Sequence, residues 1–265
     1  MKVGIVQMSS DTNKVKNIEK AIYNIDNLAS EGCKLIILPE YVNFLGPSDL
    51  KKENSETVNG NLVKQISAKA LQTGCYIHLG SFLEKEGSNI YNTSLVFDNC
   101  GQIISKYRKI HLFDVNVPGE IVHIESKVIS AGKDIATFNI GDFVFGMATC
   151  YDLRFPELFR KLAERGANVF IVPSAFHLNT GRDHWEVLLR ARAIENQSYV
   201  IAPDQWKGIP EHICYGRSMA IDPWGIVISR ASDQECNLVI NLDDSLIIKA
   251  RTFLPALKHR RQDLF

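Results

Sequence analysis

Short apolar segments alternate along the chain with longer stretches in which apolar residues recur at helical spacing. Residues 3–8 and 34–38 are largely apolar over the length of a buried strand. Between them, residues 14–30 carry apolar side chains along one side of a helix, at Val15, Ile18, Ile22, Ile25 and Leu28. This order of strand, helix and strand predicts an α/β protein.

The alternation continues through the first hundred residues. Residues 62–72 are predicted to form a second helix and residues 76–79 another strand. Pro39 is expected to end the strand over residues 34–38, because proline has no N–H to donate to a sheet. Asp98 and Gly101 occupy the first and fourth positions of a segment typical of a tight turn between two strands.

Four segments of the first half of the chain recur in the same order in the second half. The matched pairs are Val3–Met8 with Phe145–Cys150, Glu31–Pro39 with Arg165–Pro173, Cys75–Leu79 with Ser198–Ala202, and Ser94–Gly101 with Ser218–Gly225. Any α/β chain repeats strand–helix units, so one match alone would mean little. Four matches in one order, two of which keep their turn residues, predict a pseudo-twofold repeat.

The repeat predicts how the layers of the protein pack. Two αβ layers packed sheet against sheet, with the helices outside, would bury both faces of these apolar strands. No linker rich in Gly, Ser or Pro separates the two halves. We therefore predict a four-layer α-β-β-α sandwich that forms a single domain over residues 1–265.

The balance of acidic and basic side chains indicates which classes of binding partner the sequence does not favour. The chain has 265 residues with 30 basic and 30 acidic side chains, so nothing in it favours a nucleic acid or an anionic membrane. No stretch approaches the roughly 18 apolar residues of a membrane span. The first residues already read as a strand, which leaves no room for a signal peptide. We expect a cytoplasmic protein.

The six cysteines are widely spaced, at positions 33, 75, 100, 150, 214 and 236. Neither Cys-x-x-Cys nor His-Glu-x-x-His occurs, which argues against a metal site. The glycine-rich motifs of nucleotide-binding loops are also missing. We therefore expect a protein of a reducing compartment without metal or cofactor.

Cys150 is the first candidate for chemistry, because it stands where an apolar strand gives way to a turn and then a helix. A nucleophile at such a junction is held by a stiff strand, and the N–H groups of the following helix point towards it. The alternative is structural, since a free cysteine often packs as a small buried hydrophobe. A nucleophilic thiol also needs a base or a cation nearby.

Glu40 is the second candidate, because it directly follows the strand that ends at Pro39. Functional groups of α/β sheets gather beyond the carboxyl ends of strands, where Glu40 would serve as a general base. The alternative is a solvated residue at a strand end. In the repeat, Ser174 takes the place of Glu40 and Met8 takes the place of Cys150. The predicted site is therefore asymmetric on a symmetric scaffold.

Lys109 and Glu125 are further charged candidates. If residues 105–113 form a strand, Tyr107, Lys109 and His111 share one of its faces. An inward Lys109 would stabilise an oxyanion and lower the pKa of the thiol, whereas the alternative is a solvated basic strand. Glu125 lies in a loop region, where a glutamate taken alone is usually solvated.

These residues lie in motifs that resemble the nitrilase superfamily of carbon–nitrogen hydrolases. The motifs are Leu-Pro-Glu40, Tyr-Arg-Lys109-Ile-His-Leu-Phe-Asp and Cys150-Tyr-Asp-Leu-Arg-Phe-Pro-Glu. The likeness covers essentially the whole chain and extends to the ending Arg260-Arg-Gln-Asp-Leu-Phe265. The fold of that superfamily is an α-β-β-α sandwich, which agrees with the prediction from the repeat.

The resemblance implies a role for each residue that matches the motifs. Cys150 would attack an amide carbonyl to form a thioester. Glu40 would take the thiol proton, pass it to the departing ammonia and then activate water. Lys109 and the backbone N–H of Tyr151 would hold the oxyanion, while Glu125 would orient the substrate and support the site.

Residues 113–119, 125–127 and 175–181 resemble the Nit-type amidase branch, which includes omega-amidases and deaminated-glutathione amidases. The resemblance implies that Arg154 and Thr180 bind a carboxylate of the substrate and that Phe176 forms a pocket wall. The planar guanidinium of arginine suits a carboxylate, although Arg154 would alternatively pair with Glu157. The preferred substrates are 2-oxoglutaramate and 2-oxosuccinamate, with deaminated glutathione, other small amides or N-carbamoyl compounds as alternatives.

Two departures from the omega-amidase pattern leave the substrate open. Ala131 stands where the pattern often has proline before Gly132, and residues 205–214 match neither sub-branch. Two other functions also stay open: a Cys–His hydrolase that uses His177 or His184, and a catalytically silent binding protein on the same fold. The resemblance further implies a homodimer or higher homo-oligomer, assembled through residues 156–165 and 253–265.

Overall fold

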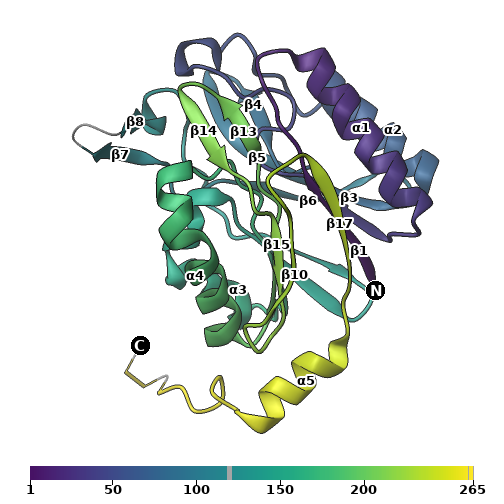
Figure 1. Cartoon of the computed structure of the whole chain (residues 1–265), viewed down its shortest axis with the longest axis vertical. Coiled ribbons are helices and arrows are strands. Elements are labelled where there is room, and N and C mark those ends of the chain that lie inside the picture. The colour runs from purple at the N-terminus through teal and green to yellow at the C-terminus, as the bar shows by residue number, and fades with distance from the viewer. Residues whose placement is uncertain (118–120, 262, 265) are drawn as a thin grey trace.

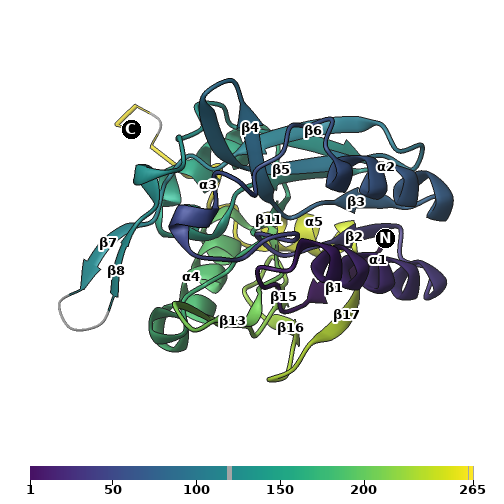
Figure 2. The ribbon, with the colours of Figure 1, turned by 90° about the horizontal axis from the view of Figure 1, so that it is seen from above.

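The computed structural model describes residues 1–117, 121–261 and 263–264. Two sheets stack face to face, and helices cover their outer faces (Figures 1 and 2). This is the α-β-β-α order of layers that the repeat predicts. Positions 118 and 119 of the 113–119 motif, and positions 262 and 265 of the C-terminal motif, lie outside the described residues.

The first sheet has the strand order β17-β1-β2-β3-β5-β4, with β6 also paired to β5. Its strands are β1 (Lys2–Gln7), β2 (Leu35–Ile37), β3 (Tyr76–His78), β4 (Phe82–Glu86), β5 (Asn89–Phe97), β6 (Ile103–Arg108) and β17 (Cys236–Asn241). Strands β1, β2 and β3 run parallel to one another, and β17 closes one edge antiparallel to β1.

The second sheet has the order β16-β15-β12-β11-β10-β9. Its strands are β9 (Thr137–Ile140), β10 (Phe143–Met147), β11 (Val169–Ile171), β12 (Tyr199–Ala202), β15 (Met219–Ile221) and β16 (Val227–Arg230). The order β10-β11-β12-β15-β16 reproduces β1-β2-β3-β5-β6, and β9 flanks β10 antiparallel as β17 flanks β1. The predicted pseudo-twofold repeat is therefore present in the strand order.

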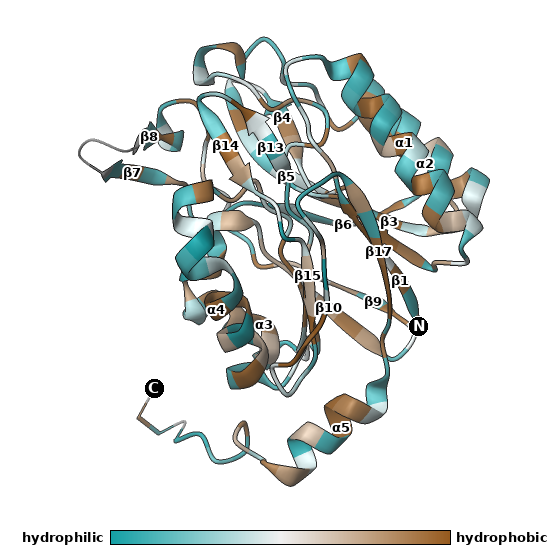
Figure 3. Ribbon diagram, in the orientation of Figure 1, coloured by the Kyte–Doolittle hydropathy of each residue, from teal (hydrophilic) through white to brown (hydrophobic). Residues whose placement is uncertain are grey.

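The helices form the two outer layers and a C-terminal extension. They are α1 (Lys14–Ser30) and α2 (Asn61–Thr73) on the first sheet, α3 (Pro156–Glu164) and α4 (Leu178–Asn196) on the second, and α5 (Asp244–Phe253) after β17. The central strands are hydrophobic along most of their length, whereas the helices mix hydrophobic and hydrophilic residues (Figure 3). Among the described residues, no helix combines the length and apolarity that a membrane crossing requires.

One part of the core lies between the two sheets. Val3 and Ile5 of the first sheet belong to the same buried cluster as Phe145, Met147 and Ile171 of the second. Each of these side chains is fully buried, so the alternate faces of the strands hold the sheets together through apolar contact. Separate clusters join the outer face of each sheet to its own helices.

The structure differs from the predicted elements mainly around the pocket at one edge of the two sheets. Strand β6 ends at Arg108, so Lys109 follows the strand instead of lying within it, although its N–H still donates to Asn92 O at 2.9 Å. Two hairpins were not predicted: β7 (Asp114–Val117) with β8 (Ile121–Ile124), and β13 (Trp206–Ile209) with β14 (His212–Tyr215). Both of these hairpins border the pocket described below.

Gly80 fixes the path of the chain next to Glu40. It follows β3 with a φ of +65°, a conformation that side chains with a Cβ rarely adopt. A Cβ at this position would clash with the backbone oxygens of Pro39 and Leu38. The close approach of these two segments therefore requires a glycine, and it holds the Pro39–Glu40 peptide beside the end of β3.

Candidate active site

Cys150 occupies a strained turn immediately beyond β10. Its φ is +48°, in the left-handed region that costs free energy for a residue with a Cβ. Cys150 begins a 3₁₀ helix, η3 (Cys150–Arg154), and its N–H donates to Pro173 O at 3.0 Å. Thr149 and Asp152 form a capping box across the turn. The turn therefore holds the thiol in one place at the end of the strand.

Buried hydrogen bonds brace this turn from the β6 side. Asp152 is fully buried and accepts from the Tyr107 hydroxyl at 2.6 Å and from the His111 N–H at 3.0 Å. Tyr107 and His111 are the two residues that were predicted to share a face with Lys109. Their contact with Asp152 fixes the segment carrying Lys109 against the segment carrying Cys150.

Glu40 follows β2 and is 1% exposed, so the alternative of a solvated strand end is wrong. Its Oε1 accepts from Asn92 Nδ2 at 2.7 Å and from Lys109 Nζ at 3.2 Å. Its Oε2 accepts from the backbone N–H of Ala175 at 2.7 Å. These three donors come from three different segments, which fixes the carboxylate although it is buried.

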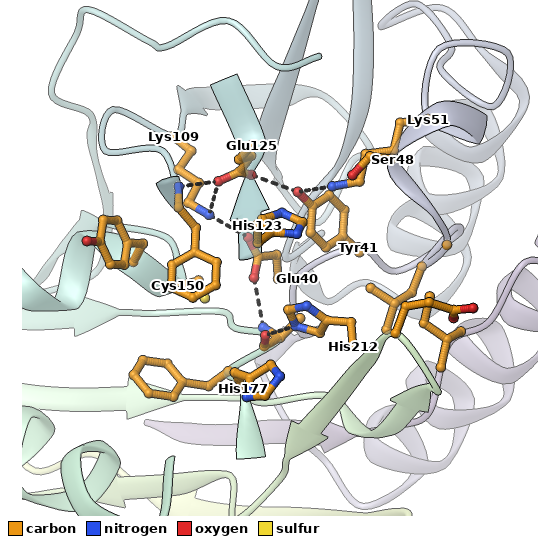
Figure 4. Close-up of a pocket in the computed structure, with 18 of the residues that line it drawn as sticks. Glu40, Tyr41, Ser48, Lys51, Lys109, His123, Glu125, Cys150, His177 and His212 are labelled. Atoms are coloured by element: carbon orange, nitrogen blue, oxygen red, sulfur yellow. Dashed lines mark hydrogen bonds and ion pairs between the residues drawn. The ribbon is translucent and has the colours of Figure 1, made fainter. Parts of the chain in front are cut away.

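Lys109 lies between two buried carboxylates. Its ammonium is 2.9 Å from Glu125 Oε2 and 3.2 Å from Glu40 Oε1, and the side chain is 2% exposed (Figure 4). Burial alone would lower the pKa of Lys109, but Glu125 and Glu40 raise it well above its ordinary value. The lysine is therefore charged, and the alternative of a solvated basic strand is wrong.

Glu125 begins the short 3₁₀ helix η2 (Glu125–Lys127) directly after β8 and is buried, not solvated. Besides Lys109, it accepts from the Phe113 N–H at 2.7 Å and from the Tyr41 hydroxyl at 2.8 Å. Burial alone would raise the pKa of Glu125, but Lys109 and Lys51 lower it to about 2. Glu125 is thus an anion that fixes the lysine.

The resting state of Cys150 is a neutral thiol. Burial and the nearby Glu40 carboxylate raise the pKa of Cys150 well above its ordinary value, against the opposing effect of Lys109. Lys109 lowers this pKa, as expected, but its effect is smaller than that of burial, and the pKa stays above its ordinary value. A base must take the proton during the reaction, and Glu40 is placed near the thiol.

These groups open into one pocket of about 690 Å³, a volume that includes space open to solvent. The pocket is lined by all eight residues predicted for the site: Glu40, Lys109, Glu125, Cys150, Tyr151, Arg154, Phe176 and Thr180. A pocket in which a few charged side chains converge beside aromatic ones suits a small organic ligand. The structure therefore brings the predicted residues together from both halves of the repeat.

Arg154 lies on the wall of the pocket formed by η3. Its guanidinium lies 5.5 Å from the ring centre of Phe176 and 3.2 Å from His184 Nδ1. It makes no ion pair with Glu157 in the part of the chain that the structure describes, so the expected alternative partner is not used. Of the two histidines that the alternative Cys–His hydrolase would use, His184 contacts Arg154 and His177 lines the pocket. Thr180 stands in the first turn of α4 and donates to His177 O at 3.3 Å.

Several pocket residues were not identified from the sequence. Tyr41 follows Glu40 directly, while Lys51 follows the 3₁₀ helix η1 (Ser48–Leu50) in a charged stretch that reads as solvated. His123 and His212 come from the two unpredicted hairpins. The one available signal was the departure of residues 205–214 from the family pattern, since His212 belongs to that stretch.

Both hairpin histidines are neutral at physiological pH. Burial, followed by the neighbouring Lys51, lowers the pKa of His123 to about 4. Burial lowers the pKa of His212 to about 3, although its hydrogen bond to Ala175 O opposes this. Within the described ranges, no three His, Cys, Asp or Glu side chains form a group that could hold a metal ion.

We predict that Glu125 makes the stability of the protein depend on pH. Its folded-state pKa of about 2 lies below the ordinary value of 4.5, so the unfolded chain binds more protons between these values. The stabilisation is complete above pH 4.5 and is lost as the pH falls towards 2. The difference in unfolding free energy between wild type and Glu125→Gln, measured by urea denaturation, should shrink over that window.

The exposed Glu53 provides the matched control for this prediction. The difference between wild type and Glu53→Gln should change little over the same range of pH. A difference between wild type and Glu125→Gln that stays constant from pH 5 to pH 2 would contradict the assignment of Glu125 as a stabilised anion.

The chain is similar to known proteins along its whole length. The family model described as "Carbon-nitrogen hydrolase" matches residues 2–251. The chain is 35% identical to "Omega-amidase NIT2" of Danio rerio over 265 residues, which cover all of this chain and 96% of that protein. It is 38% identical to "Deaminated glutathione amidase" of Mus musculus over 271 residues, covering 99% of this chain and 84% of that protein.

A solved structure shows the same fold. The crystal structure of Nit3 from Saccharomyces cerevisiae, a member of the nitrilase superfamily, superposes with a TM-score of 0.90 at 33% sequence identity. That match covers 98% of this chain and 96% of the other. The fold predicted from the repeat and from the resemblance is thereby confirmed. This chain belongs to the carbon–nitrogen hydrolase family of the nitrilase superfamily, and it is an amidase.

Proposed function

We propose that this amidase hydrolyses the terminal amide of 2-oxoglutaramate and 2-oxosuccinamate, releasing ammonia. The observation that carries the proposal is the buried Lys109, which bridges Glu40 and Glu125 in the pocket that also holds the Cys150 thiol. Arg154 in the same pocket supplies a guanidinium for the far carboxylate of such a substrate. The full-length similarity to proteins named omega-amidases supports this choice of substrate.

In the first step, the Cys150 sulfur attacks the amide carbonyl while Glu40 accepts the thiol proton. The carbonyl oxygen becomes an oxyanion, which the Lys109 ammonium and the Tyr151 N–H stabilise. Tyr151 is in the first turn of η3, where N–H groups have no acceptor within the helix. The proton transfer is required because the resting thiol is neutral.

In the second step, Glu40 returns the proton to the amide nitrogen, and ammonia leaves a thioester on Cys150. Glu40 then takes a proton from water, the resulting nucleophile attacks the thioester, and the thiol is regenerated as the acid departs. The proton moves only between Glu40 and the reacting atoms. Glu125 keeps Lys109 charged and in place throughout the cycle, since it lies 2.9 Å from the ammonium.

A second candidate substrate is deaminated glutathione. It is favoured by the 38% identity to the Mus musculus protein that bears this name. It would use the same Cys150 thioester chemistry but would release an amine larger than ammonia. Products measured with both substrates distinguish these candidates.

We also propose that the protein is a single domain, lies in the cytoplasm and forms a homo-oligomer. A single domain over residues 1–265 is supported by the family match to residues 2–251. A cytoplasmic location is supported by six free cysteines, which a reducing compartment favours. A homodimer or higher homo-oligomer is supported by the exposed apolar side chains of Trp224 and Phe253, which line one surface pocket beside α5.

We expect Glu40→Gln to lower ammonia release from 2-oxoglutaramate by about 10³-fold or more, because the amide cannot accept the thiol proton. Cys150→Ala should abolish release. Cys100→Ala, which removes an exposed cysteine outside the pocket, is the matched control and should keep wild-type activity. Ammonia is measured directly, and thermal melting confirms that each variant is folded.

Substantial turnover by Glu40→Gln would contradict the proposal. It would favour a Cys–His hydrolase in which His177 serves Cys150. A purified wild-type protein that releases no ammonia from any small amide would favour the binding protein instead.

We expect Arg154→Lys to raise KM for 2-oxoglutaramate by about 10- to 100-fold, because lysine cannot form the bidentate contact with a carboxylate. The rate at saturation should change much less, and turnover of an uncharged aliphatic amide should not change. Arg182→Lys, at an exposed position of α4, controls for the substitution itself. Unchanged kinetics towards 2-oxoglutaramate in Arg154→Lys would remove Arg154 from substrate recognition.

A further inference from the structure

Gln205 is a fully buried amide beyond β12 that the proposed mechanism does not use. It begins the stretch 205–214, which departs from the family pattern. Its Nε2 donates to the Glu40 carbonyl oxygen at 2.7 Å and to Ser10 Oγ at 3.0 Å, and its Oε1 accepts from the Ser10 N–H at 2.9 Å. Both donors and the acceptor of the amide are therefore used. The side chain joins the second half of the repeat to two segments of the first.

The bond to Glu40 fixes the orientation of one peptide group, which links Glu40 to Tyr41. The carbonyl of this peptide accepts from Gln205, and its N–H donates to Ser81 Oγ at 3.0 Å. Of the residues that the structure describes, only Gln205 donates to the Glu40 carbonyl. Gln205 and Ser81 are both fully buried, so water does not replace these bonds easily. The peptide is held from both sides by side chains of distant segments.

This peptide needs such restraint because the residue that follows it is strained. Tyr41 has a φ of +57°, in the left-handed region that is unfavourable for a residue with a Cβ. Rotation of the Glu40–Tyr41 peptide plane changes ψ of Glu40 and φ of Tyr41 together, so it would relieve this strain. A strained conformation persists only where its surroundings over-determine it. The bond from Gln205 opposes the rotation at the carbonyl end of the peptide.

The side chains on either side of this peptide both belong to the site. The Glu40 carboxylate lies 3.2 Å from Lys109 Nζ, and the Tyr41 hydroxyl donates to Glu125 Oε1 at 2.8 Å (Figure 4). Glu40 and Glu125 are the two carboxylates between which Lys109 lies. The orientation of one peptide therefore sets the direction of the general base and of the hydroxyl that supports Glu125.

We propose that Gln205 is a positioning residue for the general base: its amide holds the Glu40–Tyr41 peptide in the orientation that keeps the Glu40 carboxylate close to the Cys150 thiol. The inference rests on the proposed function, because it takes Glu40 as the group that accepts the thiol proton. Within the described part of the chain, Gln205 is not among the residues that line the pocket. It is therefore expected to affect proton transfer and not the binding of substrate.

Gln205→Met tests the inference, because it removes the hydrogen bonds and keeps the length of the side chain. We expect kcat for 2-oxoglutaramate to fall by about 10- to 100-fold, since a displacement of about 1 Å in an active site has effects of this size. KM should change by less than about threefold, because Arg154 and the pocket wall are unchanged.

Gln7→Met is the matched buried control. Gln7 is 1% exposed, and its amide donates to Ser232 O and Gln234 O and accepts from the Ser218 N–H. The variant loses a similar set of buried bonds that do not involve Glu40. It should unfold at a lower urea concentration, as Gln205→Met should, but keep kcat within about threefold of wild type.

A double variant separates a positioning role from a merely structural one. If Gln205 acts through Glu40, its substitution matters little once the base is gone. Gln205→Met should therefore lower the residual kcat of Glu40→Gln by less than about threefold. Equal losses in the wild-type and Glu40→Gln backgrounds would overturn the inference. A folded Gln205→Met with the kcat of wild type would also overturn it.

If Gln205→Met does not fold, Gln205→Asn decides in its place. Asparagine keeps a polar amide at this buried position, but it is one methylene shorter and cannot make the same bond to the Glu40 carbonyl. We expect the same loss of kcat with little change in KM, and thermal melting shows whether the variant is folded. A kcat within about threefold of wild type would overturn the inference.

The same measurements separate this inference from the proposed function. A large loss in Glu40→Gln without a loss in Gln205→Met would overturn only the role of Gln205. Wild-type turnover by Glu40→Gln would overturn the proposed mechanism, and the inference would fail with it. If wild type hydrolysed another small amide but not 2-oxoglutaramate, the proposed substrate would fail. The variants would then be compared on that amide, because the role of Glu40 does not depend on the acid released.

Discussion

The site depends on one buried cation held between two buried carboxylates. Lys109 lies 2.9 Å from Glu125 and 3.2 Å from Glu40, and all three side chains are at most 2% exposed. Removing Lys109 would leave two carboxylates in the interior without their cation, and breaking a buried ion pair in this way typically costs about 3–5 kcal/mol. Hydrogen bonds from Asn92, Ala175, Phe113 and Tyr41 complete the shell of the carboxylates. The same arrangement places a proton acceptor near a thiol that burial keeps neutral.

The repeated scaffold explains why these groups meet. Strands β2 and β10 end at the same edge of the sandwich and deliver Glu40 and Cys150, one from each half. Their counterparts in the repeat, Ser174 and Met8, are fully buried and carry no charge. A symmetric fold therefore provides two equivalent positions, and the side chains at those positions make the chemistry asymmetric. The loops and hairpins around the edge add the groups that select a substrate.

The sequence was most informative about features that local patterns determine, namely the strands, the helices and the motifs of the site. Continuous apolar strands, the two helices predicted between them and the repeat were sufficient to predict the layers, and the motifs led to Glu40, Lys109, Glu125 and Cys150. Patterns could not reveal that Lys51 is buried, because its neighbours in the sequence are charged and its burial depends on packing, in part against the ring of Tyr41. His123 and His212 were also missed, because two hairpins that were not predicted bring them into the pocket from distant segments. The pKa of Cys150 also depends on burial, which a motif does not report.

The most direct measurement of the central claim is rapid-quench mass spectrometry of the enzyme mixed with 2-oxoglutaramate. We predict that the peptide containing Cys150 gains one 2-oxoglutaryl group during turnover and loses it as the substrate is consumed. Turnover with Cys150 unmodified at every quench time, or with the acyl group on another residue, would contradict the account.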